Sequence, residues 1–150
     1  MRTLALLIMA ALSACAPQYV ETVASDPSDI PVRRATFAAD PAPLDAAFRA
    51  SCDTPGDEIR QISRGVLQCR IPPPPDLAAF LVLQYDGALA APTLVVQKET
   101  EQAVDSVVVE LSYFAEVVQK SGNPRRIYFR QRSLDALMDA LLEATGGNTS

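Results

Sequence analysis

The chain has 150 residues, 49% of them hydrophobic, and a formal net charge of −5. This length and composition suffice for one domain with an apolar core, and the acidic balance argues against non-specific binding to nucleic acid or to anionic lipid. The chain contains no histidine, so a catalytic pair of nucleophile and histidine is excluded.

The N-terminus has the pattern of a secretory signal peptide. One positive charge at Arg2 precedes an uninterrupted apolar run over residues 4–12, and the small residues Ser13 and Ala14 follow it. The apolar run is too short for a transmembrane helix, which needs about 20 residues. We therefore expect residues 1–14 to be removed as a signal peptide.

Residues 12–15, Leu-Ser-Ala-Cys, resemble the lipobox of bacterial lipoproteins. The resemblance implies cleavage after Ala14 and a diacylglyceryl group on the sulfur of Cys15, so that membrane lipid is the first partner. Two or more acyl chains give lasting attachment, whereas one chain binds only marginally. In enterobacterial lipoproteins, an aspartate directly after the cysteine tends to retain the protein in the inner membrane. Ala16 takes that position here, so the same sorting rule would imply the outer membrane, with the protein on its periplasmic face. The alternative is an ordinary cleaved signal with an unmodified cysteine.

Residues 15–43 are expected to form a lipidated, disordered tether. Five prolines interrupt this stretch and polar residues fill the gaps between them, a composition that resists packing. A flexible coil of this length spans about 30 Å, and prolines extend it further. The remaining residues, 44–147, are expected to form a single globular domain.

The first half of that domain contains short elements. Helical spacing predicts a helix over residues 44–51, and residues 59–62 fit either a strand or a helical turn. Residues 66–71 predict a strand, which a four-proline connector ends. Residues 77–85 are ambiguous: the apolar run before Asp86-Gly87 favours a buried strand over a helix, and residues 94–100 predict another strand.

The second half has clearer periodicity. Alternation over residues 107–117 predicts a strand with one set of residues in the core and most of the other set near water. The core set is Val107, Val109, Leu111, Tyr113, Ala115 and Val117, and the other set is Val108, Glu110, Ser112, Phe114 and Glu116. Residues 126–130 predict a strand with Ile127 and Phe129 inward. Residues 134–144 predict an amphipathic helix that Ser133 caps. The expected fold is α+β, an antiparallel sheet of four to five strands with a short N-terminal helix and the C-terminal helix packed on it.

The three cysteines are consistent with a non-cytosolic compartment. If Cys15 carries lipid, Cys52 and Cys69 remain as an even pair in an oxidising environment, and we expect them to form a disulfide. A metal site is the alternative. Two cysteines alone do not complete a metal site, and the chain has no histidine that could add a ligand. We therefore expect no metal and no cofactor.

A basic cluster is the candidate site for binding a partner. It comprises Arg125, Arg126, Tyr128, Arg130 and Arg132. Arginine and tyrosine are enriched in the residues that dominate protein interfaces. The alternative is that Glu110 and Glu116 on the neighbouring strand neutralise the arginines.

No catalytic constellation is predicted. Glu99, Glu101, Glu110 and Glu116 could form an acid–base pair, but they alternate with core positions and are expected to form a solvated face. We expect a non-enzymatic, membrane-anchored lipoprotein that acts as a binding or accessory module for an envelope protein. The alternatives are a protective inhibitor of a cell-wall hydrolase and, with less support, a carboxylate-dependent hydrolase.

Overall fold

The computed structural model describes residue 30 and residues 32–85 and 92–149. The expected signal peptide, Cys15 and the first half of the expected tether lie outside the described residues. The elements in chain order are β1 (Val32–Phe37), α2 (Ala42–Ala50), β2 (Glu58–Ser63), β3 (Val66–Ile71), α3 (Pro75–Gln84), β4 (Thr93–Gln102), β5 (Val107–Val118), β6 (Pro124–Ile127), α4 (Arg132–Ala144) and β7 (Asn148–Thr149).

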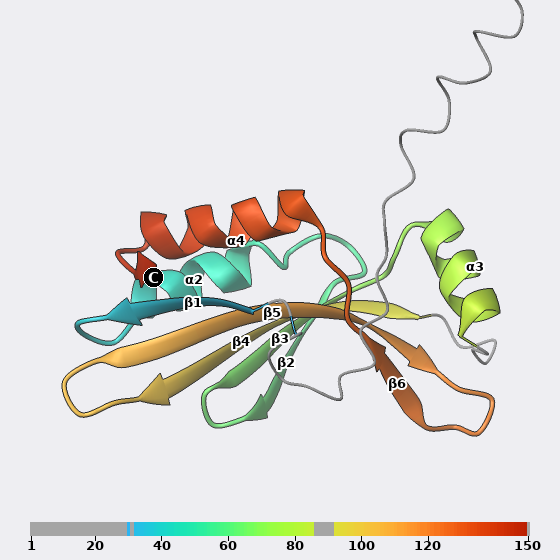
Figure 1. Ribbon diagram of the computed structural model, residues 1–150, viewed down its shortest axis with the longest axis horizontal. Coiled ribbons are helices and arrows are strands. Elements are labelled where there is room, and N and C mark those ends of the chain that lie inside the picture. Colours follow the sequence, from blue (N-terminus) through green and yellow to red (C-terminus); the bar gives the residue numbers. More distant parts are fainter. Residues whose placement is uncertain (1–29, 31, 86–91, 150) are drawn as a thin grey trace, which may run out of the picture.

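Within the described residues, one antiparallel sheet of seven strands carries the fold (Figure 1). Its order is β2-β3-β4-β5-β1-β7, and β6 pairs with the second half of β5, beyond the part that pairs with β1. The expected α+β class with an antiparallel sheet is confirmed, but the expectation of four to five strands was too low. The ambiguous segment at residues 59–62 is strand β2.

The helices cover one face of this sheet unevenly. α2 and α4 lie over one half, and α3 stands at the opposite end beside β6 (Figure 1). No helix of the described ranges covers the other face, which we call the open face. Alternate residues of β5 point toward the helices and are buried, among them Leu111, Tyr113 and Val117. The alternation predicted for this strand is confirmed.

β1 lies inside the stretch expected to be an unpacked tether. The sequence of β1 does not show the apolar–polar alternation of a strand, because only Ala35 and Phe37 place apolar side chains on the helix side. On that side Arg33 forms an ion pair with Asp139 of α4. On the open face Arg34 pairs with Glu110 of β5. The ion pair of Arg33 therefore takes a position at which a strand pattern would show a hydrophobic residue.

Residues 77–84 lie in helix α3 and Tyr85 is its C-cap residue, so the strand favoured by the sequence for residues 77–85 is wrong. Pro74 and Pro75 lie at the start of α3, where a missing N–H group costs little. A run of apolar residues fits a buried strand or a helix equally well. The helix buries Leu81 and leaves other apolar side chains exposed, so uniform hydrophobicity did not mean uniform burial.

The other predicted elements need smaller corrections. The helix predicted at 44–51 is α2, and the strand predicted at 126–130 ends at Ile127, although Ile127 and Phe129 are buried as expected. α4 begins at Arg132, so Ser133 is not its N-cap. After α4, a Cβ atom on Gly147 would lie 2.7 Å from Cζ of Phe37, so a glycine is needed where the chain turns into β7.

Candidate binding surface

A strongly basic segment surrounds β6. Residues 119–132 contain five basic residues and no acidic residue, within a chain of net charge −5. We call this segment the basic hairpin, because it comprises the turn after β5, strand β6 and the connection to α4. A local positive charge of this size attracts acidic groups even on an acidic protein.

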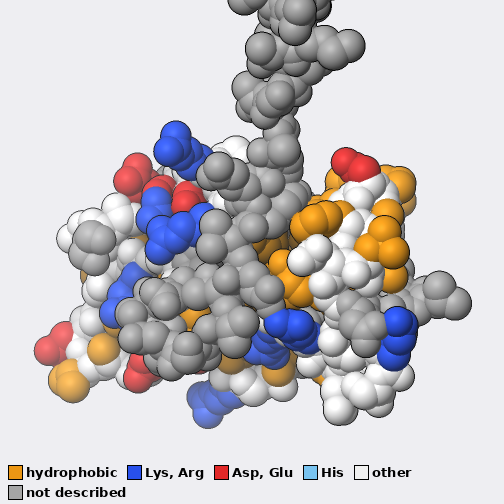
Figure 2. All heavy atoms as spheres, turned by 45° about the vertical axis from the view of Figure 1, so that its right-hand side comes forward, with side chains coloured by type: hydrophobic (Ala, Val, Ile, Leu, Met, Phe, Trp, Pro, Cys, Tyr) orange, Lys and Arg blue, Asp and Glu red, His pale blue; other side chains and the backbone are white. Residues whose placement is uncertain are grey.

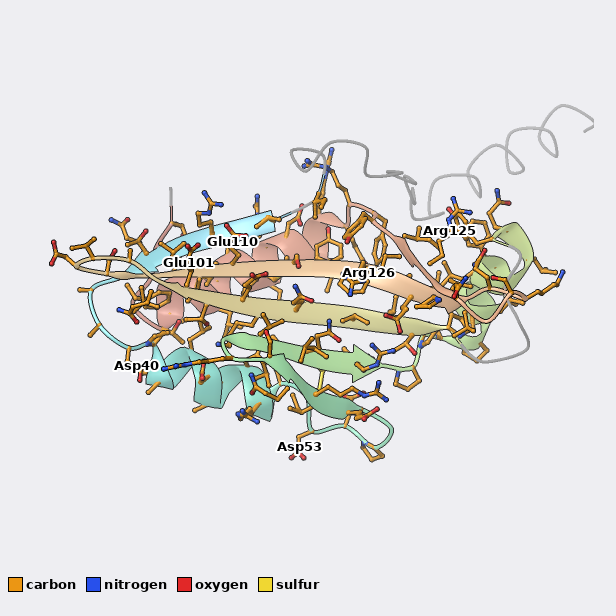
Figure 3. All side chains as sticks on the ribbon, turned by 90° about the horizontal axis from the view of Figure 1, so that it is seen from below. Asp40, Asp53, Glu101, Glu110, Arg125 and Arg126 are labelled. Atoms are coloured by element: carbon orange, nitrogen blue, oxygen red, sulfur yellow. A yellow bond between two sulfur atoms is a disulfide. The ribbon has the colours of Figure 1, made fainter. Side chains whose placement is uncertain are left out.

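The arginines of β6 do not share one face. Arg125 lies opposite Val117 on the helix side, and Arg126 lies opposite Glu116 on the open face (Figure 3). The guanidinium carbon of Arg125 lies 5.4 Å from the ring centre of Tyr85, and that of Arg126 lies 4.7 Å from the ring centre of Phe114. Both arginines are thus held over aromatic rings, a favourable electrostatic contact.

Phe114 is buried, although it lies on the side of β5 that was expected to be mostly near water. It is 1% exposed on the open face, and its ring lies 5.6 Å from the ring of Tyr128. Arg126 lies over the same ring. Phe114 of β5 therefore forms a small apolar centre on the open face, against which Tyr128 and Arg126 of the basic hairpin pack.

The two glutamates expected to neutralise the cluster have other partners. Arg34 pairs with Glu110, and Nη2 of Arg70 donates a hydrogen bond of 2.6 Å to Oε1 of Glu116. Across the described residues, no carboxylate lies within ion-pair distance of Arg126, Arg130 or Arg132. In the described part of the chain, no ion pair neutralises the charge of these three arginines.

The glutamates considered for catalysis lie on the open face. Glu99 and Glu110 are opposite each other on β4 and β5, and Glu101 is exposed further along β4 (Figure 3). Glu110 and Glu116 are each bound by an arginine. The arrangement is that of a charged sheet surface with ion pairs between its strands.

Helix α3 adds an exposed apolar surface that sequence reasoning missed. Leu83 is 84% exposed and Phe80 is 42% exposed. Figure 2 shows apolar side chains gathered over α3, with basic side chains nearby. Nε2 of Gln119 donates a hydrogen bond of 2.9 Å to the carbonyl oxygen of Tyr85, which joins the end of α3 to the basic hairpin. The two features therefore form one continuous surface.

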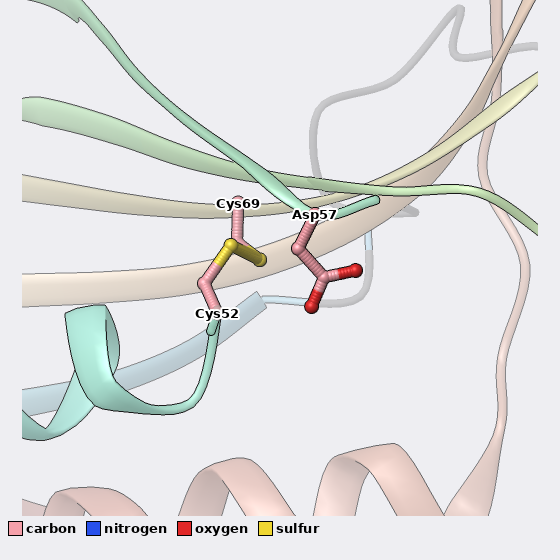
Figure 4. Close-up of side chains that lie close together, drawn as sticks. All are labelled: Cys52, Asp57 and Cys69. Carbon is pink, nitrogen blue, oxygen red and sulfur yellow. A yellow bond between two sulfur atoms is a disulfide. The ribbon is translucent and has the colours of Figure 1, made fainter. Parts of the chain in front are cut away.

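The disulfide lies between the end of α2 and strand β3. Cys52, after α2, is bonded to Cys69 of β3, with their Cα atoms 5.8 Å apart, as the cysteine count predicted (Figure 4). Asp57 lies beside the two sulfurs (Figure 4). Because each sulfur is bonded to the other, neither is a thiolate that could bind a metal ion. The bridge joins the end of α2 to the sheet.

Comparisons with family models, with curated proteins and with solved structures gave no match. In the part of the chain that the structure describes, no helix has the length and hydrophobicity needed to cross a membrane.

Proposed function

We propose that this protein is a non-enzymatic lipoprotein of the cell envelope that binds an acidic protein partner. The lipid on Cys15 holds it on the periplasmic face of the outer membrane, and the domain acts at the end of its N-terminal connection. The partner binds to the basic hairpin and the adjoining surface of α3.

One observation carries the proposal: exposed Leu83 and Phe80 adjoin the basic hairpin, a segment of charge +5. Among the described residues, no carboxylate forms an ion pair with Arg126, Arg130 or Arg132. Large exposed apolar side chains beside polar residues are typical of interaction sites. Arginine and aromatic residues supply most of the energy at such sites, and charge complementarity sets the choice of partner. The expected partner surface is therefore acidic around an apolar centre.

Support for the anchor comes from residues outside the described part of the chain and from the disulfide. The lipobox resemblance of residues 12–15 specifies Cys15 as the acylated residue. A disulfide between Cys52 and Cys69 fits an oxidising compartment such as the periplasm.

Site-specific crosslinking in intact cells of the native host tests the binding surface. A photoreactive residue at position 83 is expected to give a discrete adduct with one envelope protein. The same residue at position 62 is the matched control, because Ile62 is exposed to 54% on β2, away from α3. An adduct of equal yield at both positions, or none at position 83, would contradict the proposed surface.

Charge reversal tests the role of the arginines. Arg126→Glu together with Arg130→Glu is expected to abolish the adduct at position 83, and Arg64→Glu, in the turn between β2 and β3, is expected to leave it unchanged. If the acidic partner were instead a cell-wall hydrolase, its lytic activity would fall when the wild-type protein binds. An adduct that survives both hairpin substitutions would remove the basic hairpin from the site.

The anchor is tested separately by metabolic labelling with palmitate. The wild-type chain is expected to incorporate label and to fractionate with the outer membrane, and the variant Cys15→Ser is expected to do neither. An unlabelled wild-type protein would contradict the lipoprotein assignment while leaving the crosslinking result intact.

A further inference from the structure

Lys98 is a buried charge in the apolar core. It lies on the helix side of β4, opposite Leu111 of β5 and Leu67 of β3, and is 4% exposed. The preceding residues on this side of β4 are Leu94 and Val96. Burying an ammonium group costs several kcal/mol unless partners compensate for the lost water, so this position calls for an explanation.

Two side chains contact the ammonium group of Lys98. Its Nζ donates a hydrogen bond of 2.8 Å to Oγ1 of Thr100 and forms an ion pair of 2.6 Å with Oδ1 of Asp45 on α2. An ammonium group has three N–H donors, so one of them has no partner among the described residues. Oδ1 of Asp45 is shielded from water, yet the Asp45 side chain is 46% exposed, so its other oxygen faces outward.

A polar cleft of about 250 Å³ opens beside this ion pair. Two carboxylates and two cations line it: Asp40 and Asp45, and Arg49 and Lys98. Its floor includes Gly65 of the β2–β3 turn, whose carbonyl oxygen accepts a hydrogen bond of 2.9 Å from the N–H of Thr100. The volume equals about eight waters, which fits a small metabolite and excludes a folded partner.

The balance of charges specifies the chemistry of the ligand. A ligand with a single charge would leave two lining groups of its own sign facing it, and like charges at short range are unfavourable. A small zwitterion meets both signs. Its carboxylate would pair with the exposed guanidinium of Arg49. Its own ammonium would pair with the outward oxygen of Asp45 and with Asp40.

We propose that the cleft between α2 and the β2–β3 turn binds a free α-amino acid or a similarly small zwitterion. The cleft lies at the opposite end of the sheet from the basic hairpin, as the positions of Asp40 and Arg125 show (Figure 3). The proposal is therefore independent of the proposed partner surface, and either can fail alone.

The test is an NMR titration of the purified full chain with glycine, following the backbone amides of Gly65 and Thr100. Saturable shifts with a dissociation constant in the range of about 1–10 mM are expected, with no shift at Gly122. N-acetylglycine lacks the ammonium and glycinamide lacks the carboxylate, so each is expected to bind at least about tenfold more weakly.

Variants of exposed residues keep the test separate from folding. Arg49→Gln and Asp40→Asn are each expected to weaken glycine binding about tenfold, because each removes one charged contact. The matched controls Arg64→Gln and Asp53→Asn, exposed and outside the cleft, are expected to leave it unchanged. Unsaturated shifts at about 100 mM glycine, equal binding of either fragment, or normal affinity in Arg49→Gln would each overturn the proposal.

Discussion

The hydroxyl of Tyr113 accepts a hydrogen bond of 2.7 Å from the backbone N–H of Gln131, and it donates one of 3.0 Å to Asp135. Gln131 is the N-cap residue of α4, and no side chain caps this helix from within. A buried tyrosine of β5 therefore binds at the start of α4 and fixes the helix on the sheet.

Replacing Tyr113 by phenylalanine should lower the free energy of unfolding by about 1–3 kcal/mol, because it removes two hydrogen bonds, one of them to the carboxylate of Asp135. Urea denaturation followed by circular dichroism measures the change. Tyr128→Phe is the control, because no hydrogen bond to the Tyr128 hydroxyl is formed within the described residues, and it should cost less. Equal losses in the two variants would contradict the bridging role.

The same residue makes stability depend on alkaline pH. Burial is the main cause that raises the pKa of Tyr113 above its ordinary value of 10.0, and the hydrogen bond to Asp135 acts in the same direction. A raised pKa favours the neutral form in the folded state. The stabilisation is therefore fully present below pH 10 and is lost as the pH rises through the folded pKa.

Ultraviolet titration of phenolate absorbance measures this shift directly. Of the four tyrosines, one should ionise later than an exposed tyrosine in the folded protein, and that late step should be missing in Tyr113→Phe. A titration curve that the substitution leaves unchanged in shape would assign the late step to another tyrosine.

Phe114→Ala should destabilise the protein by about 3–5 kcal/mol, the usual cost of removing a buried aromatic ring. The expectation follows from its 1% exposure beneath Arg126 and Tyr128. Val118→Ala, on the same face of β5 but partly exposed, should cost clearly less. Comparable unfolding midpoints for the two variants would show that the ring is open to solvent.

Gly147→Ala should destabilise the protein by about 1–3 kcal/mol through overpacking. The added methyl group would meet Cζ of Phe37 at 2.7 Å and Cβ of Ala35 at 2.9 Å. Asn148→Ala, at the next and exposed residue, is the control and should be nearly neutral. Thermal unfolding compares the two, and an unchanged midpoint for Gly147→Ala would mean that β7 can move away from β1 at little cost.

Removing the disulfide by Cys52→Ser with Cys69→Ser should cost about 3 kcal/mol, the value expected for a loop of this length. The free energy of unfolding of the wild type, measured by denaturation with and without a reductant, should differ by the same amount. If reduced and oxidised wild type unfold at the same denaturant concentration, the bridge contributes nothing to stability.

Much of the fold could be predicted from periodicity alone. Strand β5, strand β3 and helices α2 and α4 were predicted because each shows a clear apolar pattern. α3 was predicted as a strand because its apolar residues do not gather on one face of the helix, so the sequence shows no helical period. β1 and β7 were missed because arginines and polar residues occupy them, and they are strands only through pairing with distant residues.

The candidate sites were predictable to the same extent. The basic residues were visible as a cluster, but their separation onto two sides of β6 required the register with β5. The exposed surface of α3 was hidden by its assignment as a strand. The buried position of Lys98 was predictable, because Lys98 continues the alternation of apolar residues through Leu94 and Val96 on the same side of β4.

The placement of β1 has a mechanical consequence. β1 is paired with β5 on one side and with β7 on the other, so we consider a pull on Val32 directed along the axis of β1. Such traction shears the six register positions from Val32 to Phe37 together, whereas a perpendicular force would open them one by one. A domain restrained from its N-terminal end is thereby built to withstand tension.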